Sequence, residues 1–440
     1  MNNNLISFVK SVFSLKTIFP IKSSIPGGNI FLISIWFLIT FTVLSGSVRK
    51  WLTGPGVMSN LIFLIQLLLP LILYYFTSKA KIKSTFTTPI FFLIFILYII
   101  IAAVNPKNQT IYHGIFGIVI HLGFWILLLT YYKLRLGFEI EKFTNFMVLI
   151  LIGEVVLGSI QYSLPGSHFL NTFSTGEDNT AGVGEAIRVS GTFSFLGGFQ
   201  ALVIFYGFFI WFLLVRKYSP IIIFIVFGVS LFAGLLSGSR GSVGFLLIIS
   251  AFAFIYTGFL FKFFLNTLVS LCVLGFLLFY LGGSFVSKFD NAYTNFLTRI
   301  NGGYENNKEL EGRVVGSYTE IFDFKGMYPV YGIGLGSTYQ GANALFGESV
   351  YAKQYGYYES ELGRVVIEGG YILLFLRITL FLVMIRFSFI PFIGKVLIFI
   401  LFLNSMIVFN TYLGVFFFLG IIFVDRAYYL EAPLSIKNAK

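Results

Sequence analysis

The sequence predicts an all-α polytopic membrane protein, with about twelve transmembrane helices and one large extracytoplasmic loop near its C-terminal end. Three observations predict this class: the composition, the long apolar runs and the placement of the basic residues. Of the 440 residues, 57% are hydrophobic and 11% are charged, and the mean hydropathy is +0.89. In a soluble domain, roughly a quarter of the residues are charged. So little charge cannot coat a water-facing surface of this size, which excludes a large soluble protein.

Apolar runs of roughly 17–25 residues mark helices that can cross a bilayer. In chain order the predicted spans are 30–48, 57–77, 88–104, 113–131, 143–164, 194–215, 219–236, 242–258, 260–281, 365–387, 391–408 and 410–428. Pro391 and the break at Asn410-Thr411 leave little room for two complete crossings at the end of the chain. Residues 5–21 place their apolar side chains on one helical stripe, which predicts an amphipathic helix lying on the membrane.

The basic residues orient this bundle, because cytoplasmic connections carry an excess of Lys and Arg. With the N-terminus inside, the cytoplasmic connections hold Lys79, Lys81, Lys83, Lys133, Arg135, Lys142, Arg216, Lys217 and Lys262. The external connections hold Arg49, Lys50, Lys107, Arg188 and Arg240 and the acids Glu177, Asp178 and Glu185. Both termini are therefore predicted to be cytoplasmic. Residues 1–281 form the interfacial helix and nine spans, 282–364 the extracytoplasmic loop, and 365–440 three spans and the C-terminus.

Several kinds of chemistry are excluded by what the sequence lacks. The single cysteine, Cys272, lies in an apolar run, so neither an internal disulfide nor a thiolate metal site can form. The histidines His113, His121 and His168 show no metal-ligand spacing. The net charge of +12 is spread over short loops, which is what membrane orientation requires, so nucleic acid is not expected as a partner. Gly332, Gly334 and Gly336 have no strand-to-helix context around them, so they do not indicate a nucleotide site. They predict a sharp turn instead.

Four arginines on the predicted external side are candidates for binding an anionic group. Each lies close to Gly or Ser, and the four are Arg188, Arg240, Arg313 and Arg364. The guanidinium offers a fixed fork of donors to phosphate oxygens, and small neighbours let backbone amides approach as well. Alternatively, each arginine pairs with a local acid or with a lipid phosphate.

Acidic residues near the start of the tenth span are candidates for a general base. Tyr357, Glu361, Arg364 and Glu368 are spaced so that one helix places them on one face. A carboxylate beside an arginine and an aromatic ring could deprotonate a sugar hydroxyl, or it could cap a helix or form a salt bridge. Two charges lie within predicted spans, Glu154 and Arg377, and for these a functional role and a structural ion pair both remain open.

Taken in order, these motifs resemble those of the O-antigen polymerase and ligase superfamily, bacterial membrane glycosyltransferases of the GT-C type. The similar features are the many spans, the run from Arg188 to Phe193, the Ser239-Arg-Gly241 hairpin, the late external loop with Arg313 and its glycine turn, and the Glu368-x-Gly370 re-entry. They cover about half of the chain. Each motif is short, and their order and topological placement carry the resemblance.

The resemblance implies a polyprenyl pyrophosphate-linked oligosaccharide as the donor, membrane lipid and a chain-length regulator as partners, and neither metal nor nucleotide as a cofactor. It implies that Arg188, Arg240, Arg313 and Arg364 bind the pyrophosphate. The ligases carry a His-Asn pair nine residues before the re-entry acid, where this chain has Glu359-Ser360, which favours a polymerase. Glu359 and Glu361 both remain candidates for the catalytic base, and the match to the ligase histidine favours Glu359.

Four alternatives compete with an O-antigen-type polymerase. A flippase or exporter of lipid-linked oligosaccharides usually has repeated halves and short external connections, whereas this chain has a long loop between the ninth and tenth spans and no internal repeat. The departure from the His-Asn pair argues against an O-antigen ligase. A peptidoglycan-type polymerase of the shape, elongation and division family is disfavoured because its motifs are absent. A purely structural membrane protein would not need the polar external cluster.

Overall fold

The computed structural model describes residues 28–78, 89–135, 138–179, 182–183, 186–259, 290–297, 330–355 and 360–432. Within these ranges eight helices are long and apolar enough to cross a membrane, and three further apolar helices are shorter. The protein is therefore a helical polytopic membrane protein. The predicted interfacial helix at 5–21 and the predicted ninth span at 260–281 lie outside the described residues.

The chain divides into two compact units, and each is described here by itself. The first unit comprises residues Met1–Gln66, Leu136–Gly302 and Val415–Lys440, and the second comprises Leu67–Arg135 and Gly303–Gly414. Two helices, α4 (Val57–Ser78) and α20 (Thr411–Glu431), contain the points of division.

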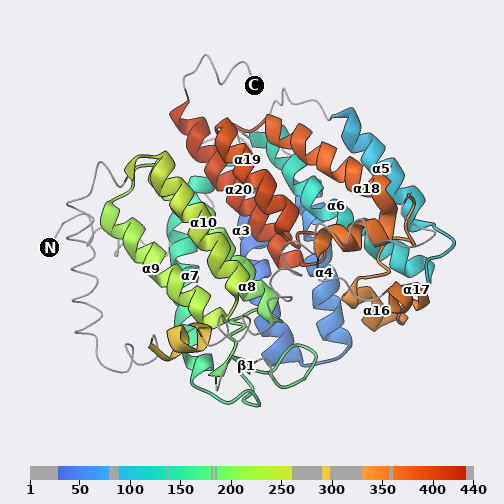
Figure 1. Cartoon of the computed structure of the whole chain (residues 1–440), viewed down its shortest axis with the longest axis horizontal. Coiled ribbons are helices and arrows are strands. Elements are labelled where there is room, and N and C mark those ends of the chain that lie inside the picture. The colour runs from blue at the N-terminus through green and yellow to red at the C-terminus, as the bar shows by residue number, and fades with distance from the viewer. Residues whose placement is uncertain are drawn as a thin grey trace. The chain divides into compact units, whose positions relative to one another are not determined.

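The first unit begins with α3 (Gly28–Ser47), which continues into the π-helical turn η1 (Val48–Thr53). It goes on through η3 (Ile140–Phe143), α7 (Thr144–Tyr162), the two-residue strands β1 (Gly182–Val183) and β2 (Ala186–Ile187), α8 (Leu196–Val215), α9 (Pro220–Ser237) and α10 (Arg240–Tyr256). The strands pair antiparallel in a minimal hairpin, and α8, α9 and α10 lie side by side (Figure 1).

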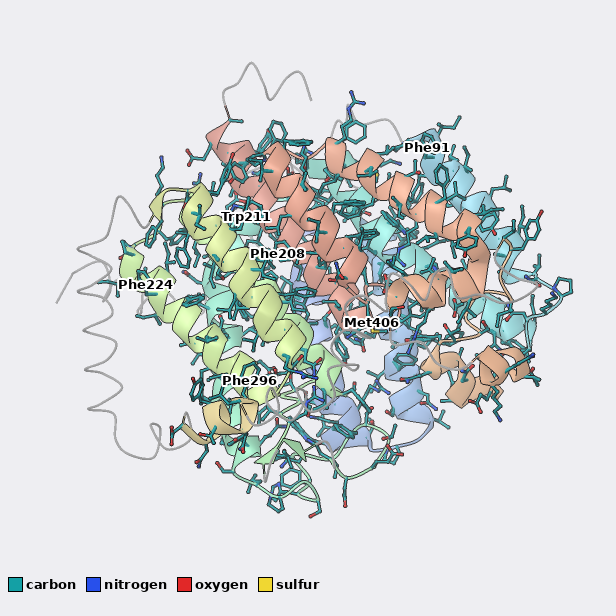
Figure 2. The ribbon with its side chains drawn as sticks, in the orientation of Figure 1. Phe91, Phe208, Trp211, Phe224, Phe296 and Met406 are labelled. Carbon is teal, nitrogen blue, oxygen red and sulfur yellow. The ribbon has the colours of Figure 1, made fainter. Side chains whose placement is uncertain are left out.

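Helix α8 forms the core of the first unit. It is apolar on every face, and nearly all of its residues are buried, as expected for a helix surrounded by others. Trp211 packs edge-on against Phe252 of α10 at 5.1 Å, and its indole N–H donates to the Tyr428 hydroxyl of α20 at 3.1 Å (Figure 2). Phe208 meets Phe417 of α20 with ring centres 5.5 Å apart. Aromatic rings thus fill the space between these helices.

The second unit contains α5 (Ile90–Ala103), α6 (Ile111–Leu134), α16 (Gln340–Phe346), α17 (Val350–Tyr355), α18 (Glu361–Arg386) and α19 (Phe392–Asn404). Helix α5 packs against α6 and α18, and α19 packs against α18 (Figure 1). The 13 residues of α19 span only about 20 Å, and the chain leaves the helix before Asn410, as Pro391 and the Asn410-Thr411 break predicted.

The predicted spans and the helices agree closely. Eleven of the predicted spans coincide with helices in the described residues, with ends that differ by a few positions. The tenth span begins earlier than predicted, at Glu361, because the Ser360 hydroxyl accepts a hydrogen bond from the Gly363 amide and caps the helix. This helix is also interrupted at Gly370, whose φ of 69° is left-handed.

Candidate functional site

In the second unit, the glycine-rich turn at 332–336 docks against α18. Its three glycines have φ of 70°, 111° and 76°, values that side chains larger than hydrogen rarely allow, and the predicted sharp turn is confirmed. Gly370 breaks the helix, so the carbonyls of Ile367 and Glu368 are available to the turn. They accept hydrogen bonds from the amides of Ile333 at 2.8 Å and Gly334 at 3.0 Å. Two motifs more than thirty residues apart thereby form one structure.

Close backbone contact explains why this structure needs glycine. A Cβ on Gly332 would collide with the Glu368 carbonyl, and one on Gly336 would collide with the carbonyl of His113 in α6. On the α18 side, a Cβ on Gly370 would collide with the Val330 carbonyl. Each backbone approaches too closely for any side chain, so the turn has a single position in the unit.

Glu368 completes this structure from inside α18. Its fully buried carboxylate accepts hydrogen bonds from the amides of Gly336 and Thr338, both at 2.9 Å, and from the Thr338 hydroxyl at 2.6 Å. The fourth contact is with Nε2 of His121 in α6, at 2.9 Å. A carboxylate oxygen pair with four such partners is fully satisfied, so Glu368 holds the turn and is not placed to take a proton from a substrate.

Glu361 and Arg377 form a buried ion pair within α18. A guanidinium N–H of Arg377 donates to Glu361, and the second carboxylate oxygen accepts from the amide of Val408 at 2.9 Å. The guanidinium lies over the Phe402 ring at 5.0 Å, and both charged side chains are 2% exposed. Of the two roles left open for Arg377, these contacts match the structural ion pair. Glu361, predicted as a candidate base, has both oxygens engaged.

Arg364 lies one turn into α18 from Glu361. It is 8% exposed, and its guanidinium lies 5.3 Å from the centre of the Phe409 ring. The predicted common face of Glu361, Arg364 and Glu368 is buried along its length. Tyr357 and Glu359 lie outside the described residues, as does Arg313.

In the first unit, the segment from Arg188 to Ser194 enters the bundle next to the turn that carries Arg240. The Nε of Arg188 donates to the Ser237 carbonyl at 3.1 Å, and the Val189 amide donates to the Leu236 carbonyl at 3.2 Å. Arg240 is the first residue of α10, where the Ser239 side chain caps the helix at the Ser242 amide. Two of the predicted arginines therefore belong to segments that touch.

Charged and polar side chains hold this segment from both sides. Lys50 donates to the Ser190 hydroxyl at 3.0 Å and the Gly191 carbonyl at 2.8 Å. From α7, Glu154 accepts from the Thr192 amide at 3.1 Å and from the Thr192 hydroxyl.

The remaining contacts extend along the same segment. Gln161 of α7 pairs with both backbone groups of Gly191, at 2.8 and 3.1 Å, and Arg49 donates to the Ser194 hydroxyl at 3.0 Å. Lys50 and Arg49 were predicted only as loop charges, and they help to hold the segment that begins at Arg188. Glu154 has the same role, so its position inside a span is explained by the backbone that it binds.

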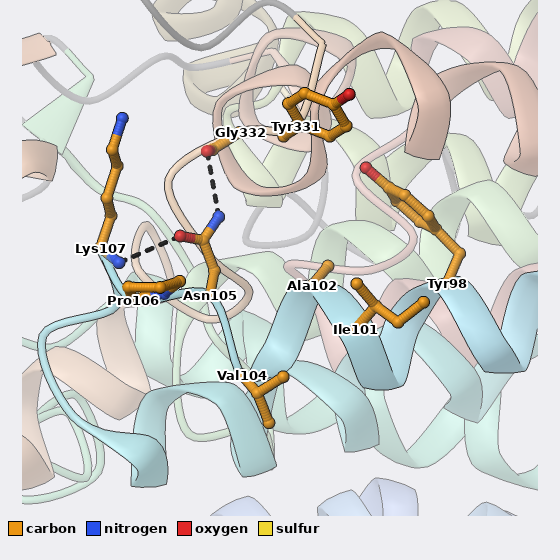
Figure 3. Close-up of a pocket in the computed structure, with 9 residues that line it drawn as sticks. All are labelled: Tyr98, Ile101, Ala102, Val104, Asn105, Pro106, Lys107, Tyr331 and Gly332. Carbon is orange, nitrogen blue, oxygen red and sulfur yellow. Dashed lines mark hydrogen bonds between the residues drawn. The ribbon is translucent and has the colours of Figure 1, made fainter.

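An open hollow of about 450 Å³ lies beside the glycine turn in the second unit (Figure 3). Its lining consists of Tyr98, Ile101, Ala102, Val104, Asn105, Pro106, Lys107, Tyr331 and Gly332. The side-chain Nδ2 of Asn105 donates to the Gly332 carbonyl at 3.2 Å, and its Oδ1 accepts from the backbone amide of Lys107 at 3.0 Å. The Tyr98 hydroxyl donates to the Gly369 carbonyl at 2.6 Å. The hollow is therefore built onto the same backbone that Glu368 orders.

The sequence analysis did not assign a site role to four residues of these structures, and only two of them carry a signal in the sequence. His121 and Lys50 are polar residues within or beside apolar helices, and such positions are expensive unless paired, so both could have been suspected. Tyr98 and Tyr331 gave no signal, because tyrosine is common throughout the chain. Only the fold brings these two rings to one hollow.

No family model, no curated protein and no solved structure matches the chain.

Proposed function

We propose that this chain is a membrane glycosyltransferase that polymerises oligosaccharide repeats, of the O-antigen or capsule type, from a polyprenyl pyrophosphate-linked donor. In this proposal it lies in a bacterial cytoplasmic membrane with twelve spans, both termini inside and residues 282–364 outside. A chain-length regulator is a further proposed partner.

One observation carries the proposal: the separate motifs of the resemblance meet in pairs. The Arg188 segment contacts the turn at Ser237, next to Arg240, and the glycine turn is hydrogen-bonded to the Glu368-x-Gly370 re-entry. Short motifs that match by chance have no reason to be neighbours in space. Each meeting also orders a segment that carries a proposed pyrophosphate-binding arginine, Arg188 or Arg364.

The proposed reaction balances without a metal or a nucleotide. A hydroxyl of the acceptor repeat attacks the anomeric carbon of the donor sugar, the new glycosidic C–O bond forms, and the bond to pyrophosphate breaks. The hydroxyl proton passes to a carboxylate, and polyprenyl pyrophosphate leaves. Arginines stabilise the negative charge on the leaving group, which is usually the largest catalytic contribution.

Between the two candidate bases, the contacts of Glu361 count against it and leave Glu359. Glu361 already neutralises Arg377 and accepts the Val408 amide, so protonating it would leave a buried cation without its partner. Glu359 precedes the capping residue of α18 and remains the candidate by its match to the ligase histidine.

The test is a reconstituted assay with purified protein in liposomes and a polyprenyl pyrophosphate-linked repeat, read as a ladder of chain lengths. Arg188→Ala is expected to lower the polymerisation rate about 10²–10³-fold, and Arg188→Lys to restore it in part, because lysine keeps the charge and loses the fork. Arg216→Ala is the matched control, since Arg216 lies in the same unit and its ion pair with Glu431 is partly exposed.

Glu359→Gln keeps the size of the side chain and removes its basicity, so a rate loss of about 10²–10⁴-fold with donor binding retained is expected. Thermal melting of each variant separates loss of chemistry from loss of fold. A ladder of normal length and rate from both Arg188→Ala and Glu359→Gln would refute the assignment. Transport of the lipid-linked repeat without any ladder would indicate a flippase.

A further inference from the structure

The hollow beside the glycine turn carries polar groups that an ordinary lipid-facing surface lacks. Part of its wall is apolar and comes from Ile101 and Val104 at the end of α5. Tyr98 and Asn105 add a hydroxyl and an amide to this wall, and both side chains are hydrogen-bonded to backbone carbonyls of the re-entry or the turn. The hollow is thus a part apolar, part polar site, built onto the backbone that Glu368 orders.

The two hydrogen-bonding side chains are held in place and keep part of their capacity. The Tyr98 hydroxyl donates to the Gly369 carbonyl at 2.6 Å, so its oxygen can still accept a hydrogen bond. The side-chain Nδ2 of Asn105 has two N–H groups and donates one of them to the Gly332 carbonyl at 3.2 Å. An acyl chain would leave these groups unpaired, whereas a ligand with hydroxyl groups can pair with both.

Tyr331 presents an exposed aromatic ring on a fixed backbone. The residue is 67% exposed, yet its own backbone lies against Gly370, and the carbonyl of the next residue, Gly332, is hydrogen-bonded. Figure 3 shows the hydroxyl groups of Tyr331 and Tyr98 close to one another. A ring held in this way is a preorganised platform, so a ligand that stacks on it orders little of the protein.

A neutral sugar fits this lining better than a phosphate does. Sugar rings have an apolar face of C–H groups, which packs on an aromatic ring, and hydroxyl groups that both donate and accept. Lys107 also lines the hollow and already interacts with another group of the protein, so the lining favours a neutral ligand. The volume of about 450 Å³ lies within the usual range for small-molecule sites, about 300–1,000 Å³.

We infer that the hollow binds one sugar residue of the oligosaccharide repeat, with an apolar face of the ring on Tyr331 and its hydroxyl groups at Tyr98 and Asn105. That this sugar belongs to a substrate rests on the proposed function. The open side of the hollow lets the rest of the repeat extend out of the site. The inference adds a subsite for sugar, separate from the arginines proposed for the pyrophosphate.

Binding of the sugar can be measured without catalysis. The probe is the free oligosaccharide repeat, released from its polyprenyl pyrophosphate by mild acid and titrated into detergent-solubilised full-length protein under saturation-transfer NMR. Tyr331→Ala is expected to weaken binding about tenfold, because it removes both the ring and the hydroxyl, and Tyr331→Phe only about threefold. Val104→Trp keeps every polar group and fills the hollow from an exposed position, so it should weaken binding about tenfold or more.

Two matched controls lie in the same unit. Tyr75 of α4 is 56% exposed and Val350 of α17 is 62% exposed, and neither lines the hollow, so Tyr75→Ala and Val350→Trp should bind the repeat as wild type does. Melting curves show whether each variant is folded. Val104→Trp also separates a sugar site from a membrane anchor. Tryptophan favours the membrane interface, so a surface that only anchors the protein predicts unchanged sugar binding in this variant.

The inference would be overturned by a wild-type protein that does not bind the free repeat, or by equal binding in wild type and the three hollow variants. Displacement of the free repeat by sugar-free polyprenyl pyrophosphate would overturn it as well. A wild-type protein that makes a ladder but binds the repeat independently of Tyr331 and Val104 would refute the sugar site alone. A protein that makes no ladder but loses the repeat on Tyr331→Ala and Val104→Trp would refute the polymerase assignment and support the sugar site.

Discussion

The buried pair of Glu361 and Arg377 gives the sharpest test of how α18 is built. Glu361→Gln removes the negative charge and leaves Arg377, 2% exposed, with no counter-ion among its described partners. Its Nε and Nη1 already have no hydrogen-bond partner within the described residues, so nothing in that region can compensate. Removing one partner of a buried pair costs about 3–5 kcal/mol of unfolding free energy.

The same cost is expected for Arg377→Met, because the Glu361 carboxylate then stays buried with only the Val408 amide as a partner. The double variant removes both charges and should recover most of the loss, since replacing a whole buried pair is often close to neutral. For a unit of this size, about 3–5 kcal/mol corresponds to a fall in melting temperature of roughly 6–20 °C.

The assay is thermal unfolding of the purified protein in detergent, with polymer synthesis measured on the same four samples. The pairing predicts two destabilised single variants, a near-normal double variant, and activity that follows folding. If Glu361→Gln melts as wild type does and the double variant is no more active than either single variant, the pairing is refuted. Glu361 would then regain its place as a candidate base.

The remaining predictions test the turn, the topology and the absence of a metal. Gly336→Ala forces a left-handed φ on alanine and drives its Cβ into the His113 carbonyl. The unfolding free energy should therefore fall by at least about 1–3 kcal/mol in the same melting assay. Gly241→Ala is the control, because open space surrounds this position of α10, and it should be neutral or slightly stabilising. In a Cys272→Ser background, an impermeant thiol reagent should label Val350→Cys from outside intact cells and should not label Lys217→Cys; the reverse pattern would invert the proposed orientation. Polymer synthesis should continue in EDTA, and a strict requirement for Mg²⁺ would contradict an arginine-based mechanism.

Some features of the site could be predicted because they depend on local sequence. The turn at Gly332–Gly336 follows from three glycines at alternate positions, and the start of α10 follows from a serine before Arg240. The sequence predicts Arg188 as a candidate for binding an anionic group, and the structure places its segment against the turn at Ser237. What could not be predicted was its support by Lys50 and Gln161, which are more than a hundred and about thirty positions away in the chain.

The acids show the same division. Glu361 and Glu368 are both candidate bases by sequence because their spacing places them on one helical face. Their actual partners come from distant segments: the Val408 amide for Glu361, and His121 and the glycine turn for Glu368. A one-dimensional pattern shows which residues share a face, but it does not show what packs against that face.

The sequence by itself determined that this is a helical membrane protein, where most of its helices lie, and where the glycine turn bends. Each of these follows from hydrophobicity, helix length or backbone freedom, which are properties of short stretches of chain. The tertiary structure alone decided which charges are paired, which motifs meet, and that a hollow lies beside Gly332. The reason is physical: a buried polar group must find its partner wherever the fold places one, and sequence distance has no part in that requirement.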